Sequence, residues 1–417
     1  MIVPPVSDPR WHDLVTGQLQ IDLDSLATKI LLARISALAA LDPTAIEPGV
    51  EELRSLFKKN SQTPKIQRDL LKVFGSNYHM GSAIYEFDEI VQGLSEGRTF
   101  LLAGPEAILS RLPAGNWIGG TAPLIEGETM DLTFSNQVFA TEMPDFILGA
   151  EIKVYEDSSS LAHLFKEAPP NSFSIIIIPY LSPMHLSFAL NAPTYPGFAT
   201  TPLAGWISGV PVGDIGSTLP KVFNGRKAQS LTNAAVVMTV TLPPDKFVEV
   251  DAVNIFEQGS GDIIMVETDG FDHAEVLING QRKLFAEYIR ANWHDSWLPL
   301  VADYHGLMVN SSFHKIDEPT GQVKFFAPLF KGVEYRLAKA ITNYEVEFLK
   351  KMPVVKKCAY VFSFNCFVNY MLFNELKVKT PANLFRPTTF GEIAYQLFNQ
   401  TMVYITISEE GSRGIDY

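Results

Sequence analysis

The first part of the chain carries hydrophobic positions at helical spacing. Apolar residues from Leu14 to Leu38 recur near the period of a helix, and the pattern stops at Asp42-Pro43. Further helices are predicted over residues 50–59, 65–74 and 85–94. Their apolar stripes are interpreted as core packing, with a surface for a partner protein as the alternative. Residues 11–95 are therefore predicted to be mostly helical.

From Thr99 onward the pattern changes to short apolar runs of the kind that strands show. The run Ile175–Ile178 indicates one buried strand. Short helices predicted over 106–112 and 158–166 separate such strands, an order that favours a mixed or parallel sheet. We predict further strands over 100–103, 117–118, 131–139, 152–155, 233–242, 247–256, 262–268, 275–278, 307–310, 322–326, 335–338, 359–364 and 401–407, and helices over 281–290, 341–351 and 367–376.

The connecting segments carry turn signals but no visible repeat. Residues 180–216 hold prolines at positions 183, 193, 196, 202 and 211, which predicts a long irregular connection. Asp269-Gly270 and Asn279-Gly280 are tight-turn signals of the type that hairpins favour. No sequence repeat at a fixed short period is visible.

These elements predict an α/β fold of mixed α+β type. Two sheet-containing halves are flanked by helices and preceded by a helical region. The predicted divisions are an N-terminal helical region over 1–95, an α/β domain over 96–230 and a second α/β domain over 231–417. A chain of 417 residues is long enough for two or three core units.

Composition excludes several classes of protein. Hydrophobic residues make up 47% of the chain and charged residues 19%, which predicts a folded protein. A net charge of −13, without a basic run, disfavours nucleic acid and anionic membranes as partners. The start of the chain lacks the basic and apolar regions of a signal peptide. Two cysteines, Cys358 and Cys366, suit a reducing compartment, so we expect a cytoplasmic protein.

The C-terminal half resembles a known family. Its more general matches are Leu242-Pro243, a segment over 251–259, Asn279-Gly280 before a helix with Phe285 and Tyr288, residues 297–300, a turn over 317–321, and Gly332. The strongest matches are Phe-Ser-Phe-Asn-Cys at 362–366, Phe-Gly-Glu-Ile at 390–393 and Phe-Asn-Gln-Thr at 398–401. This order is similar to that of the FIST C-terminal domain, a bacterial sensory module. Residues 116–122 resemble a turn in the FIST N-terminal domain, whereas Asn369 and Pro123 depart from the family pattern.

The resemblance implies FIST N-like and FIST C-like domains over the two predicted α/β regions. It also implies a sensory protein that binds small molecules such as amino acids, without a cofactor and without catalytic turnover. Such a protein needs a signalling partner, for which the N-terminal helical region is the expected contact. The ligand-binding candidates are Gly119, Gly120, Thr121, Asn365, Cys366, Gly391, Glu392 and Asn399.

Two of these candidates also suggest chemistry by themselves. Cys366 lies where a strand passes into a helix, a position that can lower the pKa of a thiol and make it a nucleophile. Alternatively it is a small apolar residue that fills the junction. Glu392, beside Gly391 and near Asn399, could offer a carboxylate to an amphoteric ligand. Alternatively it pairs with a neighbour such as Arg386 and serves only the fold.

Two further patterns are weaker. Residues 115–121 could form a nest of backbone N–H groups for an anion, or a tight turn. His294, His305 and His314, with Asp295, Asp303 and Asp317, form the one local cluster that resembles metal ligands. Because they lack a known ligand spacing, no metal site is predicted. Two alternatives to sensing stay open: a cysteine-dependent enzyme that uses Cys366, and a scaffolding protein.

Overall fold

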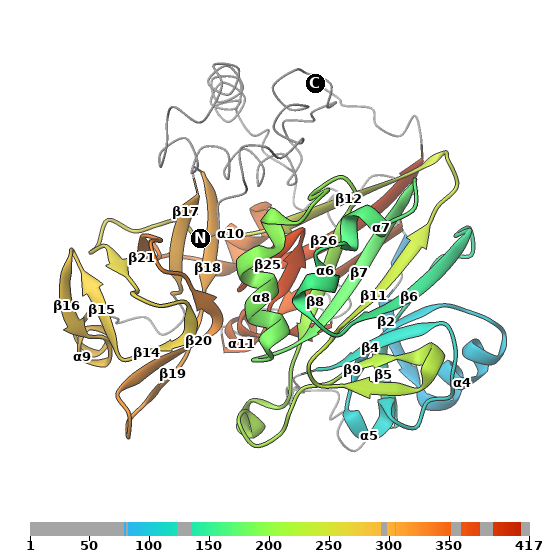
Figure 1. The fold of residues 1–417 in the computed structure, drawn as a ribbon, viewed down its shortest axis with the longest axis horizontal. Helices are drawn as coiled ribbons and strands as arrows, with labels where there is room; N and C mark the ends of the chain where they lie inside the picture. The colour runs from blue at the N-terminus through green and yellow to red at the C-terminus, as the bar shows by residue number, and fades with distance from the viewer. Residues whose placement is uncertain are drawn as a thin grey trace.

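The computed structural model describes residues 79–80, 82–122, 136–292, 298–304, 306–351, 360–375 and 387–409. Within them the chain forms a mixed α/β fold with five sheets, which confirms the predicted fold class. Figure 1 shows a body of broad sheets and a smaller lobe beside it. The helices predicted over residues 11–74 lie outside the described residues.

Within the described residues, the body contains three successive segments that repeat one order of strands. In each segment four strands, here named a, b, c and d in chain order, form a sheet in the order c–b–d–a. Strands b and c are parallel, whereas d is antiparallel to both b and a. A helix lies between b and c in every segment. The segments are therefore topological copies of one α/β unit.

The units differ in what connects strand a to strand b. Unit 1 contains β2 (Ser82–Glu86), α4 (Phe87–Ser95), β3 (Phe100–Gly104), α5 (Glu106–Leu109), β4 (Trp117–Thr121) and β5 (Gln137–Glu142). Unit 2 contains β6 (Gly149–Tyr155), α6 (Ser158–Leu161), α7 (Leu164–Glu167), β7 (Ser172–Pro179), α8 (Pro183–Asn191), β8 (Leu203–Ser208) and β11 (Ala235–Thr241). Unit 3 contains β12 (Lys246–Val253), β22 (Tyr360–Cys366), α11 (Phe367–Glu375), β23 (Thr388–Thr389) and β26 (Met402–Glu409). In unit 3 the smaller lobe takes the place of the helix between a and b.

Short hairpins link neighbouring units. The hairpin β9 (Val222–Asn224) and β10 (Gln229–Leu231) arises between c and d of unit 2 and pairs with β4 of unit 1. The hairpin β24 (Glu392–Ala394) and β25 (Gln396–Phe398) arises between c and d of unit 3 and pairs with β8 of unit 2. Each hairpin thus extends the sheet of the preceding unit.

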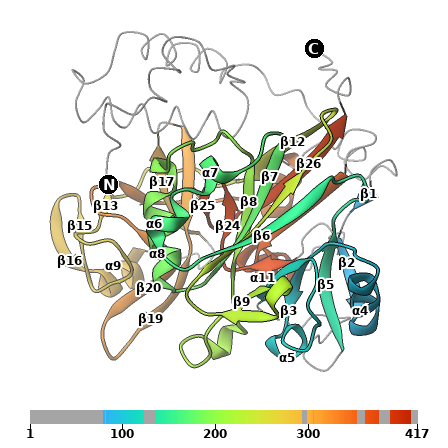
Figure 2. The same cartoon turned by 45° about the vertical axis from the view of Figure 1, so that its right-hand side comes forward.

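The largest hydrophobic core lies between the sheets. Strand β1 (His79–Met80) pairs with β22 just before the chain enters β2, so the sheets of units 1 and 3 adjoin. The unit 2 sheet covers them, and Figure 2 shows its strands in front of those of unit 3. Its central run Ile175–Ile178 is fully buried, as predicted. A Cβ on Gly120 would lie 2.9 Å from the side chains of Ile177 and Ser208, so glycine allows this close approach.

The smaller lobe has a core of its own. It contains β13 (Ile264–Met265), β14 (Gly270–His273), β15 (Glu275–Ile278), β16 (Gln281–Leu284), α9 (Phe285–Asn292), β17 (Leu300–Tyr304), β18 (Leu307–Ser311), β19 (Phe313–Asp317), β20 (Gln322–Leu329), β21 (Tyr335–Leu337) and α10 (Tyr344–Lys351). On β20, Phe325 packs into the core of the lobe and Phe326 into the core of the body. Strand β20 therefore joins the two parts.

Two sequence predictions are wrong in an instructive way. The segment 180–216 is not irregular, because it contains α8 and the fully buried β8. Pro183 occupies the first turn of α8 and Pro202 precedes β8, so these prolines stand where they break no hydrogen bond. The helix predicted over 281–290 begins only at Phe285, because the Asn279-Gly280 turn first forms the hairpin of β15 and β16.

The predicted divisions fall inside structural elements. The one at 95/96 separates α4 from β3 within one unit, and the one at 230/231 cuts β10. The other expected hairpin, at Asp269-Gly270, does not form, because β14 pairs with β20.

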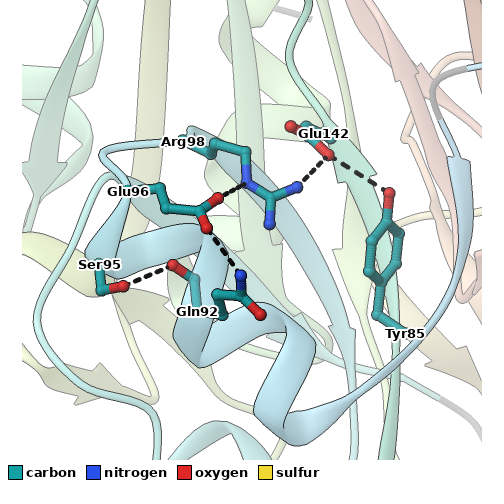
Figure 3. A network of polar contacts seen from close by, with 6 residues as sticks. All are labelled: Tyr85, Gln92, Ser95, Glu96, Arg98 and Glu142. Atoms are coloured by element: carbon teal, nitrogen blue, oxygen red, sulfur yellow. Dashed lines mark hydrogen bonds and ion pairs between the residues drawn. The ribbon is translucent and has the colours of Figure 1, made fainter.

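Figure 3 shows a polar network within unit 1, and Glu142 of this network also contacts unit 3. Arg98 Nε lies 3.2 Å from Glu96 Oε2, and Arg98 Nη1 lies 3.1 Å from Glu142 Oε2. The Tyr85 hydroxyl donates to the same Glu142 oxygen at 3.4 Å. Burial and this carboxylate raise the pKa of Tyr85. The backbone carbonyl of Glu142 accepts a hydrogen bond from Tyr360 on β22.

Candidate functional site

Four of the predicted site residues meet in one buried polar centre, here called the Glu392 centre. It contains Asn365 and Cys366 from the end of β22, Glu392 from the start of β24, and Asn399 after β25, each 0% exposed. Asn399 Nδ2 lies 3.7 Å from Cys366 Sγ and donates to the Phe390 carbonyl at 3.1 Å. The resemblance thus pointed to residues that are neighbours in space.

Glu392 is held by two threonines. Its Oε2 accepts hydrogen bonds from the backbone N–H of Thr401 at 3.2 Å and from the Thr401 hydroxyl at 2.9 Å. Its Oε1 lies 2.6 Å from Thr389 Oγ1, which also lies 3.1 Å from the Asn365 carbonyl oxygen. Arg386, the predicted ion partner, lies outside the described residues.

The hydrogen-bond geometry is complete when Glu392 carries a proton. One hydroxyl proton of Thr389 cannot serve two acceptors. If Glu392 Oε1 is protonated and donates to Thr389 Oγ1, the threonine is free to donate to the carbonyl of Asn365. Burial raises the pKa of Glu392 to about 8, in agreement with a neutral carboxylic acid at pH 7.

Cys366 lies at the predicted position, but the pKa of its thiol is shifted upward and not downward. It ends β22 immediately before α11, at the strand–helix junction where a reactive thiol was considered. Burial, followed by the nearby Glu392, raises the pKa of this thiol, so the nucleophilic thiolate is disfavoured. The geometry therefore favours the alternative of a small residue that fills the junction.

Polar residues of the lobe complete the Glu392 centre. The Ser312 backbone N–H donates to Asn399 Oδ1 at 2.9 Å, and its hydroxyl donates to Gln400 Oε1 at 2.7 Å. Asn310 Nδ2 donates to the Asn399 carbonyl at 3.2 Å. Sequence reasoning missed Ser312, Asn310 and Thr389, because isolated polar residues far apart in the chain carry no local signal. The centre is thus a clamp between unit 3 and the lobe.

The remaining predicted candidates serve packing. Gly119, Gly120 and Thr121 lie on the buried strand β4, which is paired on both edges with β3 and β9. Their backbone N–H groups take part in sheet pairing, which disfavours the anion nest considered for residues 115–121. Gly391 lets the chain pass Ile207, whose side chain would lie 3.2 Å from a Cβ at this position.

No metal cluster is present among the described residues. His314 stacks on Phe326 with ring centroids 4.7 Å apart, and burial lowers its pKa to about 4. His294, Asp295 and His305 lie outside the residues that the structure describes.

A different feature has the size of a ligand site. A concavity of ≈ 340 Å³, here called the Tyr180 pocket, lies where β7 and β8 end. Tyr180 directly follows β7, and Val210 comes shortly after β8; both are almost fully buried. The pocket is lined by Tyr180, Leu181, Ser182, Pro183, Val210, Ile215, Gly216, Thr218, Leu219, Pro220, Thr232 and Asn233.

The turn between β7 and α8 shapes one wall of this pocket. Leu181 adopts the left-handed conformation, with φ 58°, and its side chain is 47% exposed. Its backbone N–H donates to His185 Nδ1 at 3.3 Å, and the Ser182 hydroxyl caps α8 by accepting from the His185 backbone N–H. Burial lowers the pKa of His185 to about 3, so the ring stays neutral and Nδ1 stays an acceptor. The strained backbone of Leu181 thus lies at the edge of the concavity, where a ligand could contact it.

We expect Leu181→Asn to raise the free energy of unfolding by about 0.5 kcal/mol, because asparagine tolerates the left-handed region better than leucine. Urea denaturation measures the change. Leu219→Asn is the matched control, since Leu219 is also an exposed residue of the same pocket but has no positive φ. A loss above about 1 kcal/mol in Leu181→Asn alone would show that Leu181 stabilises the turn by packing.

A larger groove, of ≈ 490 Å³, lies along β6 and the hairpin of β9 and β10. Two of its charged groups, Lys153 and Glu167, already pair with each other. Lys153 Nζ lies 3.5 Å from Glu167 Oε2, which also accepts from the Tyr155 hydroxyl at 3.0 Å. The Tyr180 pocket is therefore the better candidate for a small-molecule site.

Residues 85–408 match the model of a family described as a family of unknown function, DUF6976. The chain belongs to the DUF6976 family. No curated protein and no solved structure matches it. The Glu392 centre and the Tyr180 pocket both lie within the DUF6976 segment. None of the described helices is long and apolar enough to cross a membrane.

Proposed function

We propose that this DUF6976 chain binds a small, uncharged, largely apolar molecule in the Tyr180 pocket and acts as a sensory protein without catalytic turnover. The observation that carries the proposal is the pocket itself, a concavity of ≈ 340 Å³ at the carboxyl ends of the parallel strands β7 and β8. Ligand pockets in proteins span roughly 300–1,000 Å³, and ligands of α/β sheets bind beyond the carboxyl ends of parallel strands.

The lining determines the class of ligand. Most of it is apolar, and its polar groups are the neutral side chains of Ser182, Thr218, Thr232 and Asn233. No charged side chain lines the described pocket, so nothing there would neutralise the charges of a free amino acid. A neutral aromatic or branched aliphatic molecule with one or two hydrogen-bonding groups fits this lining best.

Binding without turnover is favoured by the state of the nearby reactive groups. Burial raises the pKa of the Tyr180 hydroxyl, which disfavours a tyrosinate base. The Ser182 hydroxyl donates to the Pro179 carbonyl at 2.7 Å while it caps α8. The sensory role implied by the FIST resemblance adds a partner protein that receives the signal. The low cysteine content adds a cytoplasmic location to the proposal.

A ligand screen tests the proposal. We expect uncharged compounds such as indole, menthol and 1-octanol to raise the melting temperature, and L-phenylalanine and L-glutamate to have no effect. A compound at 100 times its Kd should stabilise the fold by about 2.7 kcal/mol. Stabilisation by the charged amino acids alone would contradict the assigned ligand class.

Thr218→Trp should abolish the rise in melting temperature that the ligand causes. Thr218 lines the pocket, so the indole ring at this position would occupy the space of the ligand. Ser217→Trp is the matched control, since Ser217 is the exposed neighbour that does not line the pocket. We expect Ser217→Trp to keep the ligand response. An equal ligand response of both variants would place the binding site outside the Tyr180 pocket. No stabilisation of the wild type by any uncharged compound would favour a scaffolding protein.

A further inference from the structure

We infer that the inserted lobe reports whether the Tyr180 pocket is occupied, with Tyr180 as the residue that connects the two. The inference rests on the proposed function, because it assigns a response to the same pocket. In unit 3 the lobe replaces the short helix that connects strands a and b in the other units. The other two units form the same strand order without such an insertion, so we expect the lobe to have a role beyond folding unit 3.

Tyr180 is in contact with both parts. Tyr180 is one of the residues that line the pocket, and its hydroxyl donates to the Phe325 carbonyl of β20 at 3.2 Å. The same ring contacts two aromatic residues of the lobe, with centroid distances of 5.9 Å to Phe326 and 6.2 Å to Phe271 on β14. A molecule in the pocket therefore lies against a residue whose side chain is anchored on the lobe.

Strand β20 can carry a displacement into the lobe. Phe325 and Phe326 are adjacent, so their side chains leave opposite faces of the strand. Phe325 stacks with Phe285 and lies 4.7 Å from the ring of Phe313, within the core of the lobe. A shift of the Phe325 carbonyl must therefore move either this core or the hydrogen bond to Tyr180.

The other side of the connection is fixed. The Tyr180 ring also makes an edge contact of 4.8 Å with Phe390, and Phe390 in turn contacts Phe326 at 5.4 Å and Phe367 at 5.0 Å. The Phe390 carbonyl is held by Asn399 of the Glu392 centre. The clamp holds Phe390 and, through Ser312, part of the lobe. A push on Tyr180 therefore reaches the lobe through the contacts of this residue on β20 and β14.

Hydrogen exchange on the full chain tests the connection without an added ligand. Thr218→Trp places an indole ring in the pocket, and Ser217→Trp places one beside it. We expect Thr218→Trp to slow amide exchange in β14 and β20 at least threefold relative to Ser217→Trp. A blue-shifted tryptophan emission of Thr218→Trp relative to Ser217→Trp verifies that the ring is buried. Asn233→Trp, from another wall of the pocket, replaces Thr218→Trp if that variant does not fold.

Tyr180→Phe then isolates the hydroxyl. In this background the difference between Thr218→Trp and Ser217→Trp should disappear from β14 and β20. Tyr195→Phe removes another buried tyrosine hydroxyl of unit 2, away from the pocket, and should leave the difference intact. Equal exchange in Thr218→Trp and Ser217→Trp would overturn the connection, as would a difference that survives Tyr180→Phe.

The ligand screen separates this inference from the proposed function. If indole stabilises the wild type but leaves the exchange of β14 and β20 unchanged, the pocket binds and the lobe does not report it. If no compound binds, the proposed function fails, and the reporting role of the lobe fails with it.

Discussion

Replacing Glu392 by glutamine should stabilise the protein at pH 8 and leave its stability nearly unchanged at pH 5. Glutamine reproduces the neutral carboxylic acid, because its amide can donate to Thr389 and accept from Thr401. The pKa of the wild-type side chain is about 8 in the fold, against an ordinary value of 4.5. The unfolded chain therefore loses this proton at a lower pH than the folded chain does.

The sign follows from linkage. A carboxyl with a raised pKa contributes stability that is fully present below pH 4.5 and is lost as the pH rises towards 8. We expect the free energy of unfolding of wild type, relative to Glu392→Gln, to fall by about 3 kcal/mol between pH 5 and 8. Urea denaturation at intervals across this range measures it.

Glu287→Gln is the control, since it makes the same chemical replacement at an exposed carboxyl group. Parallel pH profiles for wild type and Glu392→Gln would show that Glu392 is ionised in the fold. Two further outcomes would identify a structural clamp: lower stability of Glu392→Ala at every pH, and unchanged ligand binding by Glu392→Gln.

Gly205→Ala should cost at least about 3 kcal/mol of stability, because the strain falls on backbone atoms that cannot rotate away. Gly205 lies in the middle of β8, opposite Ile176 of β7 and Ile393 of β24. A Cβ at this position would lie 1.9 Å from the Ile176 carbonyl oxygen. The parallel pair that positions the Tyr180 pocket would have to separate.

Gly149→Ala is the matched control. Gly149 begins the edge strand β6 and has no atom within 4 Å of the modified position, so stability should stay within about 0.5 kcal/mol. Thermal and urea denaturation compare the two variants. Similar small losses in both would mean that β7 and β8 can adjust their spacing, and would weaken the assignment of a preformed pocket at their ends.

The elements that the sequence predicts well are those with local signals. The four isoleucines of β7, the strand–helix junction at Cys366 and the Asn279-Gly280 turn all depend on neighbouring residues, and the structure confirms their positions. The prediction of an irregular connection over 180–216 was wrong because proline restrains only its own φ and removes only one N–H donor. Where those constraints coincide with the start of an element, the element forms.

The candidate site also combines residues that local motifs predict with residues that only the folded chain brings together. The resemblance to FIST domains placed Asn365, Cys366, Glu392 and Asn399 in one group, and the structure brings them together. Their function as ligand contacts stays a prediction, and their complete burial argues for a clamp. These four residues are buried because other parts of the chain cover them, here the lobe with Ser312 and Asn310.

The fold class, most strands of units 2 and 3 and four residues of the Glu392 centre could be predicted from the sequence. Periodicity and short motifs were enough for these features, because they are properties of adjacent residues. The threefold repetition, the direction of the pKa shifts at Cys366 and Glu392, and the pocket beside Tyr180 became visible only in the folded chain. The repetition is hidden in the sequence because the three units share strand order but have different connections. The pKa shifts and the pocket depend on segments that are distant in the chain, which exclude solvent from the one and form the walls of the other.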